Sequence, residues 1–139
     1  MSIESGLKSY LGGKADLTSQ IGTRLFPLFA PQTTTTPFVV YAVVSEPHDH
    51  TLTAGAGRAT PRIQVSVYDE HLADCRVISE IIRAHMQGYS GAMGSETVSA
   101  VMLENEVTLY DPPQAGESSG LYHVEQDYFV MYEVSVPTF

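Results

Sequence analysis

The most regular pattern of hydrophobic and polar positions in this chain changes its period between residues 60 and 88. Up to Tyr68, apolar residues alternate with polar ones, which is the period of a strand with one buried face. Over residues 72–86 they recur every three or four positions, the period of an amphipathic helix. The segment therefore predicts a strand followed directly by the longest helix of the chain, with Asp69 as the N-cap and Gly88 at the end.

The N-terminal part of the chain predicts two short helices and a brief strand. Residues 2–11 place apolar side chains on one helical face and are followed by two glycines, which end the helix. Residues 16–22 repeat this arrangement, with Asp16 as the N-cap. The apolar pair Leu25 and Phe26, just before a proline, predicts a brief strand.

Three further segments predict strands. Phe38–Glu46 is apolar on both faces, which suits a central strand. Val98–Tyr110 alternates, so its apolar residues are expected on one face, namely Val101, Leu103, Val107 and Leu109. Leu121–Val136 also alternates and would span about 50 Å if fully extended, which is longer than a usual strand. We expect this strand to bend at a bulge or to leave the domain and pair with another chain.

These elements follow one another in the order α-(α)-β-β-α-β-β, leaving the brief strand aside. The predicted fold class is α+β, a mainly antiparallel sheet with helices packed on one face. With 139 residues, a single domain over 1–139 is expected. Glycines, prolines and small residues predict mobile loops near 47–60 and 111–120, and residues 133–139 form a C-terminal extension.

Charge and composition exclude several classes of function. Seven basic against sixteen acidic residues give a net charge of −9 at pH 7. No cluster of Lys or Arg provides the basic stripe that phosphate binding needs, so direct DNA or RNA binding is not expected. An acidic surface is compatible with a wall that DNA passes without sticking, because like charges repel. No membrane span is expected, and the lone Cys75 excludes an intrachain disulfide framework.

The cluster most typical of a metal site is His48-Asp49-His50. Imidazole and carboxylate together bind zinc and similar ions, although a closed site needs a further ligand that this segment does not offer by spacing. His71 and Cys75 share a helical face and are a second possible pair of ligands. The simpler interpretation is a solvated loop and a cysteine packed in the core. The alternative function that this cluster keeps open is a small metal-dependent enzyme.

Carboxylates also occur in pairs that can perform acid–base chemistry when burial separates their pKa values. The pairs are Glu104 with Glu106 and Glu125 with Asp127, each expected on one strand face. Solvated strand faces carry such pairs more often than active sites do. No signature of a hydrolase, zinc protease, phosphate loop or dinucleotide site is present. The tyrosines of the last strand are expected in the core or in a subunit interface.

Taken together, the segments resemble the tail-completion (tail-terminator) proteins of long-tailed phages and gene transfer agents. The stretches that carry the resemblance are MSIESGLKSYL, GTRLFPLFAPQ, PFVVYAVVSE, RIQVSVYDEHLADCRVISEIIRAHMQG, MGSETV and GLYHVEQDYFVMY. They cover nearly the whole chain, and each is a packing pattern rather than a chemical signature. The chain departs from the family in its threonine run, in the loop 111–120 and beyond Tyr132.

The resemblance implies a structural protein of the virion neck, located in the tail and, during assembly, in the host cytoplasm. About six copies are expected to form a ring that ends growth of the tail tube and joins the tail to the head. The implied partners are further copies of the chain, the tail-tube protein and the head–tail connector or stopper, while DNA passes through without specific binding. The resemblance implies no catalytic residues and no cofactor. A connector adaptor or stopper is the alternative within this class.

Candidate interface residues come from the segment after Pro47 and from the last strand. They are His48, Asp49, His50, Arg58, Tyr128 and Tyr132. The loop that carries the first four is expected to dock toward the tube or the connector, or to take no part in contacts.

Overall fold

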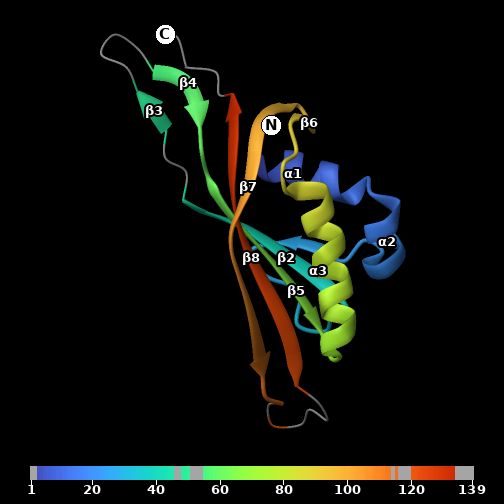
Figure 1. The fold of residues 1–139 in the computed structure, drawn as a ribbon. Coiled ribbons are helices and arrows are strands. Elements are labelled where there is room, and N and C mark those ends of the chain that lie inside the picture. Colours follow the sequence, from blue (N-terminus) through green and yellow to red (C-terminus); the bar gives the residue numbers. More distant parts are fainter. Residues whose placement is uncertain (1–2, 46–47, 51–54, 114, 116–119, 134–139) are drawn as a thin grey trace.

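A computed structural model describes residues 3–45, 48–50, 55–113, 115 and 120–133. These residues form a twisted sheet of eight strands with helices on one face (Figure 1). The helices are α1 (Ile3–Gly12), α2 (Ala15–Ile21) and α3 (Leu72–Met86). The strands are β1 (Leu25–Pro27), β2 (Phe38–Ser45), β3 (His48–His50), β4 (Gly55–Ala59), β5 (Arg62–Asp69), β6 (Gly91–Met93), β7 (Glu96–Asp111) and β8 (Leu121–Glu133).

The long strand β8 organises the sheet. It pairs with β5 and then β4 along one side and with β7 along the other, always antiparallel. The strand β2 lies beside β5, and β1 lies beyond β2. The α+β class with helices on one face is therefore confirmed. The sheet is mixed, because β1 and β2 run parallel while the other pairs are antiparallel.

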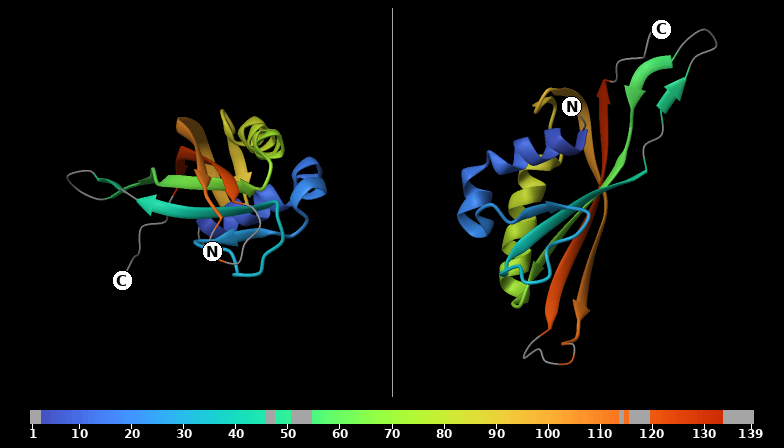
Figure 2. Two further views of the ribbon diagram at one scale, coloured as in Figure 1. Left: turned by 90° about the horizontal axis from the view of Figure 1, so that it is seen from below. Right: turned by 180° about the vertical axis from the view of Figure 1, so that it is seen from behind.

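The hydrophobic core lies between the helices and one face of the sheet, which we call the inner face. The stripe of α3 that the spacing predicted is buried on β5 and β8. It meets inward residues of those strands, which are Ile63, Val65, Val67, Val124, Tyr128 and Val130. Full burial of a side chain of this size stabilises a fold by about 1.5–3 kcal/mol. The opposite face, which we call the outer face, has no helix on it (Figure 2).

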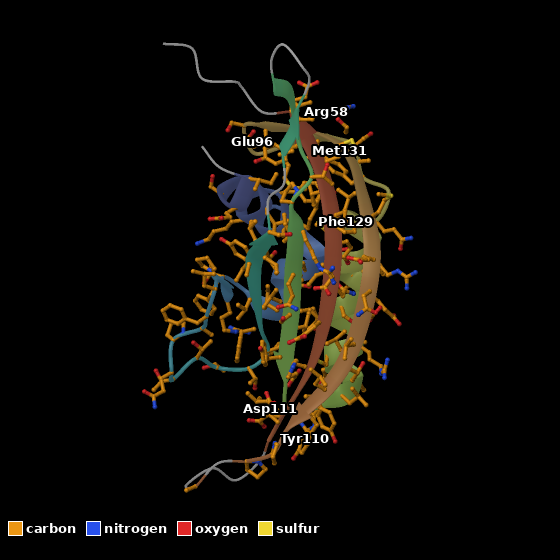
Figure 3. The ribbon with its side chains drawn as sticks, turned by 90° about the vertical axis from the view of Figure 1, so that its left-hand side faces the viewer. Arg58, Glu96, Tyr110, Asp111, Phe129 and Met131 are labelled. Carbon is orange, nitrogen blue, oxygen red and sulfur yellow. The ribbon has the colours of Figure 1, made fainter. Side chains whose placement is uncertain are left out.

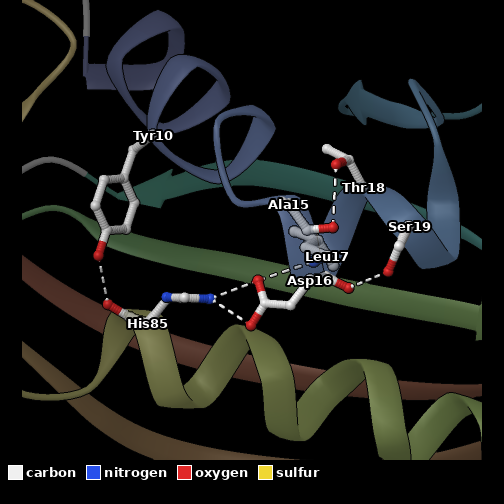
Figure 4. Close-up of polar contacts among 7 residues, drawn as sticks. All are labelled: Tyr10, Ala15, Asp16, Leu17, Thr18, Ser19 and His85. Carbon is white, nitrogen blue, oxygen red and sulfur yellow. Dashed lines mark hydrogen bonds and ion pairs between the residues drawn. The ribbon is translucent and has the colours of Figure 1, made fainter.

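Polar contacts hold the three helices to one another (Figure 4). The Tyr10 hydroxyl donates to the carbonyl oxygen of His85 over 2.7 Å. The imidazole Nε2 of His85 lies 2.8 Å and 2.9 Å from the two carboxylate oxygens of Asp16. Asp16 was predicted to cap α2, but the N-cap position belongs to Lys14 and Asp16 lies in the first turn. Its carboxylate instead links α2 to α3.

The start of α3 also differs from the prediction. Asp69 is the last residue of β5, and its carboxylate accepts a hydrogen bond from the amide of Glu70 over 2.6 Å. The helix begins at Leu72, so Asp69 is not its N-cap. The end agrees better, because α3 stops at Met86 and Gly88 then adopts a left-handed φ of 79°. No helix among the described residues is long and apolar enough to cross a membrane.

The predicted loop over 47–60 is wrong in part. Residues 48–50 and 55–59 form the strands β3 and β4, which pair with each other and project away from the helices (Figure 1). The residues of β4 are mostly small and show no alternation that would predict a strand. The strand forms by backbone pairing with β3 on one side and with the end of β8 on the other. The loop over 111–120 begins one residue late, since Asp111 still belongs to β7. The extension after Glu133 lies outside the described residues.

A β-bulge at Glu104 reverses the side-chain orientation along β7, and a separate register shift lies nearer the start of the strand, between Val98 and Ala100. Leu103 lies opposite Tyr128 and Asn105 opposite Asp127, so Glu104 is an extra residue on this strand. Before the bulge, the predicted apolar face points to the core, as expected. After it, Val107 lies opposite Glu125, on the outer face. The prediction that Val101, Leu103, Val107 and Leu109 share one face is therefore wrong, because one inserted residue reverses the alternation.

Candidate functional site

The outer face of the sheet, seen in Figure 3, is left uncovered by the helices of the molecule. Its central rows come from β5 and β8, whose outward residues stand opposite or diagonal to one another. They are Arg62, Gln64, Ser66, Tyr68, His123, Glu125, Asp127 and Phe129. Polar and acidic side chains thus fill a face that an isolated domain would present to water.

One ion-pair network joins three strands on this face. The guanidinium of Arg62 lies 2.9 Å from a carboxylate oxygen of Glu104 and 2.9 Å from one of Asp127. The hydrogen bond to Asp127 is the main cause that raises the pKa of Arg62, with the charges of the two carboxylates adding to it. Arg62 also lies over the ring of Phe129, 5.9 Å from its centroid. The network leaves this part of the face acidic.

A second cluster surrounds His123, which is buried although it belongs to the outer face. Its Nδ1 lies 3.2 Å from a carboxylate oxygen of Asp111, and its Nε2 lies 3.3 Å from one of Glu125. The ring of Tyr68 covers it at 4.9 Å between centroids. Burial is the main cause that raises the pKa of the Tyr68 hydroxyl, followed by the charges of Glu125 and Asp111. Two carboxylates beside one imidazole make this cluster attract a positively charged side chain more readily than an anion.

The second surface is the border of the sheet along β7. The lateral edge of β7 that faces away from β8 is paired only near its start, among the described residues. There β6 pairs with Glu96–Val98, and the Gly88 amide donates to the Val101 carbonyl. Beyond that point the strand exposes large apolar side chains, which are Met102, Val107, Leu109 and Tyr110. We call these four residues the β7 edge.

The third surface lies at the opposite border, beyond β1. Leu28 and Phe29 are each 72% exposed. Leu28 has a φ of 67°, a left-handed conformation that is rare for a leucine. A hollow of about 340 Å³ lies between α1, α2 and the start of β1, with Lys8 among its lining residues and with Leu11, Ile21 and Leu25 at its base. We call Leu28, Phe29 and this hollow the β1 flank.

The structure separates the residues that the sequence proposed as interface candidates. His48, Asp49 and His50 belong to β3, with His48 opposite Ala59 of β4, and their side chains lie outside the described part of the molecule. Arg58 is exposed on β4, opposite Glu133. These four residues remain interface candidates on one projecting hairpin.

The two tyrosines are different. Tyr128 has no exposed surface, and its hydroxyl donates to Gln126 over 2.8 Å inside the core. Tyr132 is also buried. Of the two positions considered for them, core and interface, the structure supports the core, because they face the helices across a fully covered part of the sheet.

The carboxylate pairs are also rearranged. The bulge places Glu104 on the outer face beside Arg62, while Glu106 lies opposite Gln126 on the inner side, so these two do not form a pair. Glu125 and Asp127 do share the outer face. Among the described side chains, no group of three or more His, Cys, Asp or Glu residues is placed to hold a metal ion. Cys75, proposed with His71, is buried, and its thiol donates to the Val67 carbonyl.

Sequence reasoning did not identify the β7 edge or the β1 flank as surfaces. The two edge residues Val107 and Leu109 were predicted on the same strand face as Val101 and Leu103, which is the core side of β7. Leu28 and Phe29 follow Pro27 as two consecutive apolar residues in a segment rich in proline. Large apolar side chains in a loop of this kind indicate an exposed contact surface, so the sequence does contain a signal for the β1 flank.

The fold defines a class of small α+β domains in which one face of a mixed sheet carries all the helices. Comparison with solved structures finds the same architecture in a chain of the virion of a native gene transfer agent (GTA) particle, with a TM-score of 0.69. The match covers 95% of this chain and 92% of that chain at 11% sequence identity. At this identity the likeness shows a shared fold. No protein-family model matches the chain, and no curated protein matches it significantly.

Proposed function

We propose that this protein is a structural component of the virion neck of a phage or gene transfer agent. In this proposal about six copies form a ring that ends polymerisation of the tail tube and joins the tail to the head. The observation that carries the proposal is the fold shared, over 95% of this chain, with a chain of a gene transfer agent virion. The proposed partners are further copies of the chain, the tail-tube protein and the head–tail connector or stopper.

The surface chemistry supports the same proposal. A sheet with two open borders offers material for contacts with neighbouring copies. The acidic network on the outer face suits a surface that DNA passes without binding, because phosphate and carboxylate repel each other. We propose no catalytic activity and no cofactor for this chain.

Removal of the gene from a strain that produces the particle tests the role. A protein that ends tail growth leaves, on its loss, tails of irregular length that do not join heads, and the gene supplied in trans restores them. Electron microscopy of the particles measures both effects. Tails of normal length that lack heads would instead assign the protein to the connector as an adaptor or stopper. Joined tails of normal length would contradict a role in the neck.

The alternative enzyme is tested in the same strain by a variant with both His48→Ala and His50→Ala. We expect this variant to restore assembly as well as the unsubstituted gene does. Elemental analysis of the purified protein measures bound metal. Loss of assembly in the variant, together with stoichiometric metal in the unsubstituted protein, would overturn the structural proposal in favour of a metal-dependent one.

A further inference from the structure

We infer that neighbouring copies of this chain join head to tail, with the β7 edge of one copy lying against the β1 flank of the next. This inference rests on the proposed ring and names the contact by which the ring closes. Both surfaces belong to the same sheet, at its two lateral borders (Figure 3).

The β7 edge has the properties of an unfinished sheet border. An open strand edge is a template for another chain, and natural proteins usually protect it with charge, brevity or a covering element. Here the open stretch carries Val107 at 38% and Leu109 at 42% exposure, both turned outward by the bulge. Within the described residues the strand is therefore long and mostly uncovered, and it exposes large apolar side chains between its acidic ones. A second chain can pair with such a border.

The β1 flank also exposes large apolar side chains, which can pack against those of the β7 edge. The left-handed backbone at Leu28 is held by hydrogen bonds from its amide to the Tyr41 carbonyl and from the Phe29 amide to the Pro27 carbonyl, at 2.8 Å and 2.7 Å. This conformation turns the chain away from the sheet and leaves two large apolar side chains in solvent. Strain retained at an exposed position points to a function outside the fold itself. The hollow at the start of β1, which Leu28 and Phe29 do not line, adds a cavity that an apolar side chain from another copy can enter.

Charge favours this pairing of the two borders over the pairing of either border with itself. The segment Glu96–Asp111 contains four acidic residues and no Lys or Arg; Glu104 is paired with Arg62 and Asp111 lies beside His123, which leaves Glu96 and Glu106. The N-terminal segment that forms the β1 flank contributes Lys8, Lys14 and Arg24, and of its two acidic residues Asp16 is already paired with His85. Complementary charge lowers the cost of the head-to-tail contact, and two copies of the acidic border repel each other.

The geometry also favours a closed assembly. A contact between two different surfaces of the same chain is heterologous, so each added copy presents a new free border. The β7 edge and the loop after β1 lie on opposite sides of the sheet in Figure 3. Repetition of such a contact forms a ring when its rotation closes and an open filament when it does not; the proposed ring requires a closing rotation, and an isologous contact cannot extend beyond a dimer.

The test uses two variants that each lose one border. Leu109→Arg removes the β7 edge, and Phe29→Arg removes the β1 flank. Each substitution places a charge at the centre of an apolar contact and is expected to weaken it about tenfold or more. The unsubstituted protein is expected to assemble at high concentration, and each variant alone is expected to lose that assembly. Mixed together, they retain one intact pair of borders and are expected to form a one-to-one dimer that grows no further. Native mass spectrometry measures all of these species.

The matched control is Val77→Arg on α3, another exposed apolar residue that belongs to neither border. It should assemble as the unsubstituted protein does. Because the dimer in the mixture requires two folded chains, its appearance also excludes misfolding as the cause of the lost assembly.

Assembly that survives both border substitutions would overturn the inference and leave the neck role untouched, since another surface would then join the copies. An unsubstituted protein that stays monomeric at every concentration would also overturn it. A ring joined at these borders, from a gene whose loss leaves tails normal, would instead support the contact and refute the proposed function.

Discussion

Arg62 on β5 and Glu104 on β7 are joined by an ion pair of 2.9 Å that spans β8, the strand between them. Glu104 is the extra residue of the bulge, so the ion pair exists only because the strand carries that insertion. The same insertion turns Val107 and Leu109 from the core side to the outer face. Glu104 thus adds a charge to the outer face, and its insertion places the apolar residues Val107 and Leu109 on that face at the β7 edge.

Deletion of Glu104 should leave the fold and the later register unchanged. Leu103 and Asn105 would then be consecutive opposite Tyr128 and Asp127, which is the regular pattern of an antiparallel ladder. Deletion of Thr108 instead shifts Leu109 to the opposite face and should destabilise the protein more, because it breaks the alternation. Thermal unfolding followed by circular dichroism compares the two. A larger loss of stability for the Glu104 deletion would show that the bulge itself is required.

Gly6 should not tolerate a side chain. A methyl group added there would collide with the backbone carbonyl of Met93, because α1 lies directly on β6 at this point. We expect Gly6→Ala to destabilise the protein by about 1–3 kcal/mol, the usual effect of overpacking. Gly12→Ala in the same helix is the control, since its methyl group meets nothing within 4 Å. That variant should be neutral or more stable by up to about 1 kcal/mol. Urea unfolding measures both, and equal effects would contradict the close approach.

The buried amide of Gln126 should be coupled to Tyr128. Its nitrogen donates to the Ser79 carbonyl over 3.0 Å, and its oxygen accepts from the Tyr128 hydroxyl. Tyr128→Phe leaves that oxygen without its partner in the core and should cost about 1–3 kcal/mol. Gln126→Met leaves the hydroxyl unpaired at a similar cost. The double variant should lose less than the sum of the two, as measured by a double-mutant cycle in urea. Strict additivity would show that the two groups do not interact.

The thiol of Cys75 should be unreactive in the folded protein. Burial is the main cause that raises its pKa from 9.0 to about 11. A thiol reagent at mildly alkaline pH should therefore modify Cys75 only after denaturation. Because the folded state holds its proton more tightly than the unfolded state, this group's contribution to stability is complete below pH 9 and is lost as pH rises toward about 11. Cys75→Ala should show a smaller loss of stability across this range. Rapid labelling of the native protein would contradict the burial.

The main strand–helix unit, β7 and β8 could be predicted from the sequence because each carries a sustained period, and β2 could be predicted because it is a continuous apolar run. The weaker elements could not. The segment of β4 is made of Gly, Ala and Arg, which carry no alternation, and it forms a strand because β8 extends beside it. The parallel pairing of β1 with β2 depends on the path of the intervening loop, which no local pattern records.

Two residues show why the site was harder to predict than the fold. Gln126 is a polar residue among the alternate apolar positions of β8, yet it is fully buried and forms hydrogen bonds with Ser79 and Tyr128. Glu104 looked like an ordinary member of an alternating strand, and its insertion into the ladder follows from pairing with β8. Both outcomes depend on partners distant in sequence, so periodicity within one segment does not contain them.

The arrangement of β4 and β5 along one side of β8 has a mechanical consequence. Arg58 and Ala59 of β4 pair with Glu133 and Tyr132 of β8, and Arg62 of β5 pairs with Phe129 further along the same strand. The projecting hairpin and the body of the sheet are therefore both paired to β8. Tension applied to the hairpin along the direction of β8 acts across hydrogen bonds that lie perpendicular to the strands. Such bonds carry the load together in shear, whereas a hairpin attached at a single turn would peel open one bond at a time. Force applied to the hairpin along β8 would therefore pass through these paired strands into the sheet.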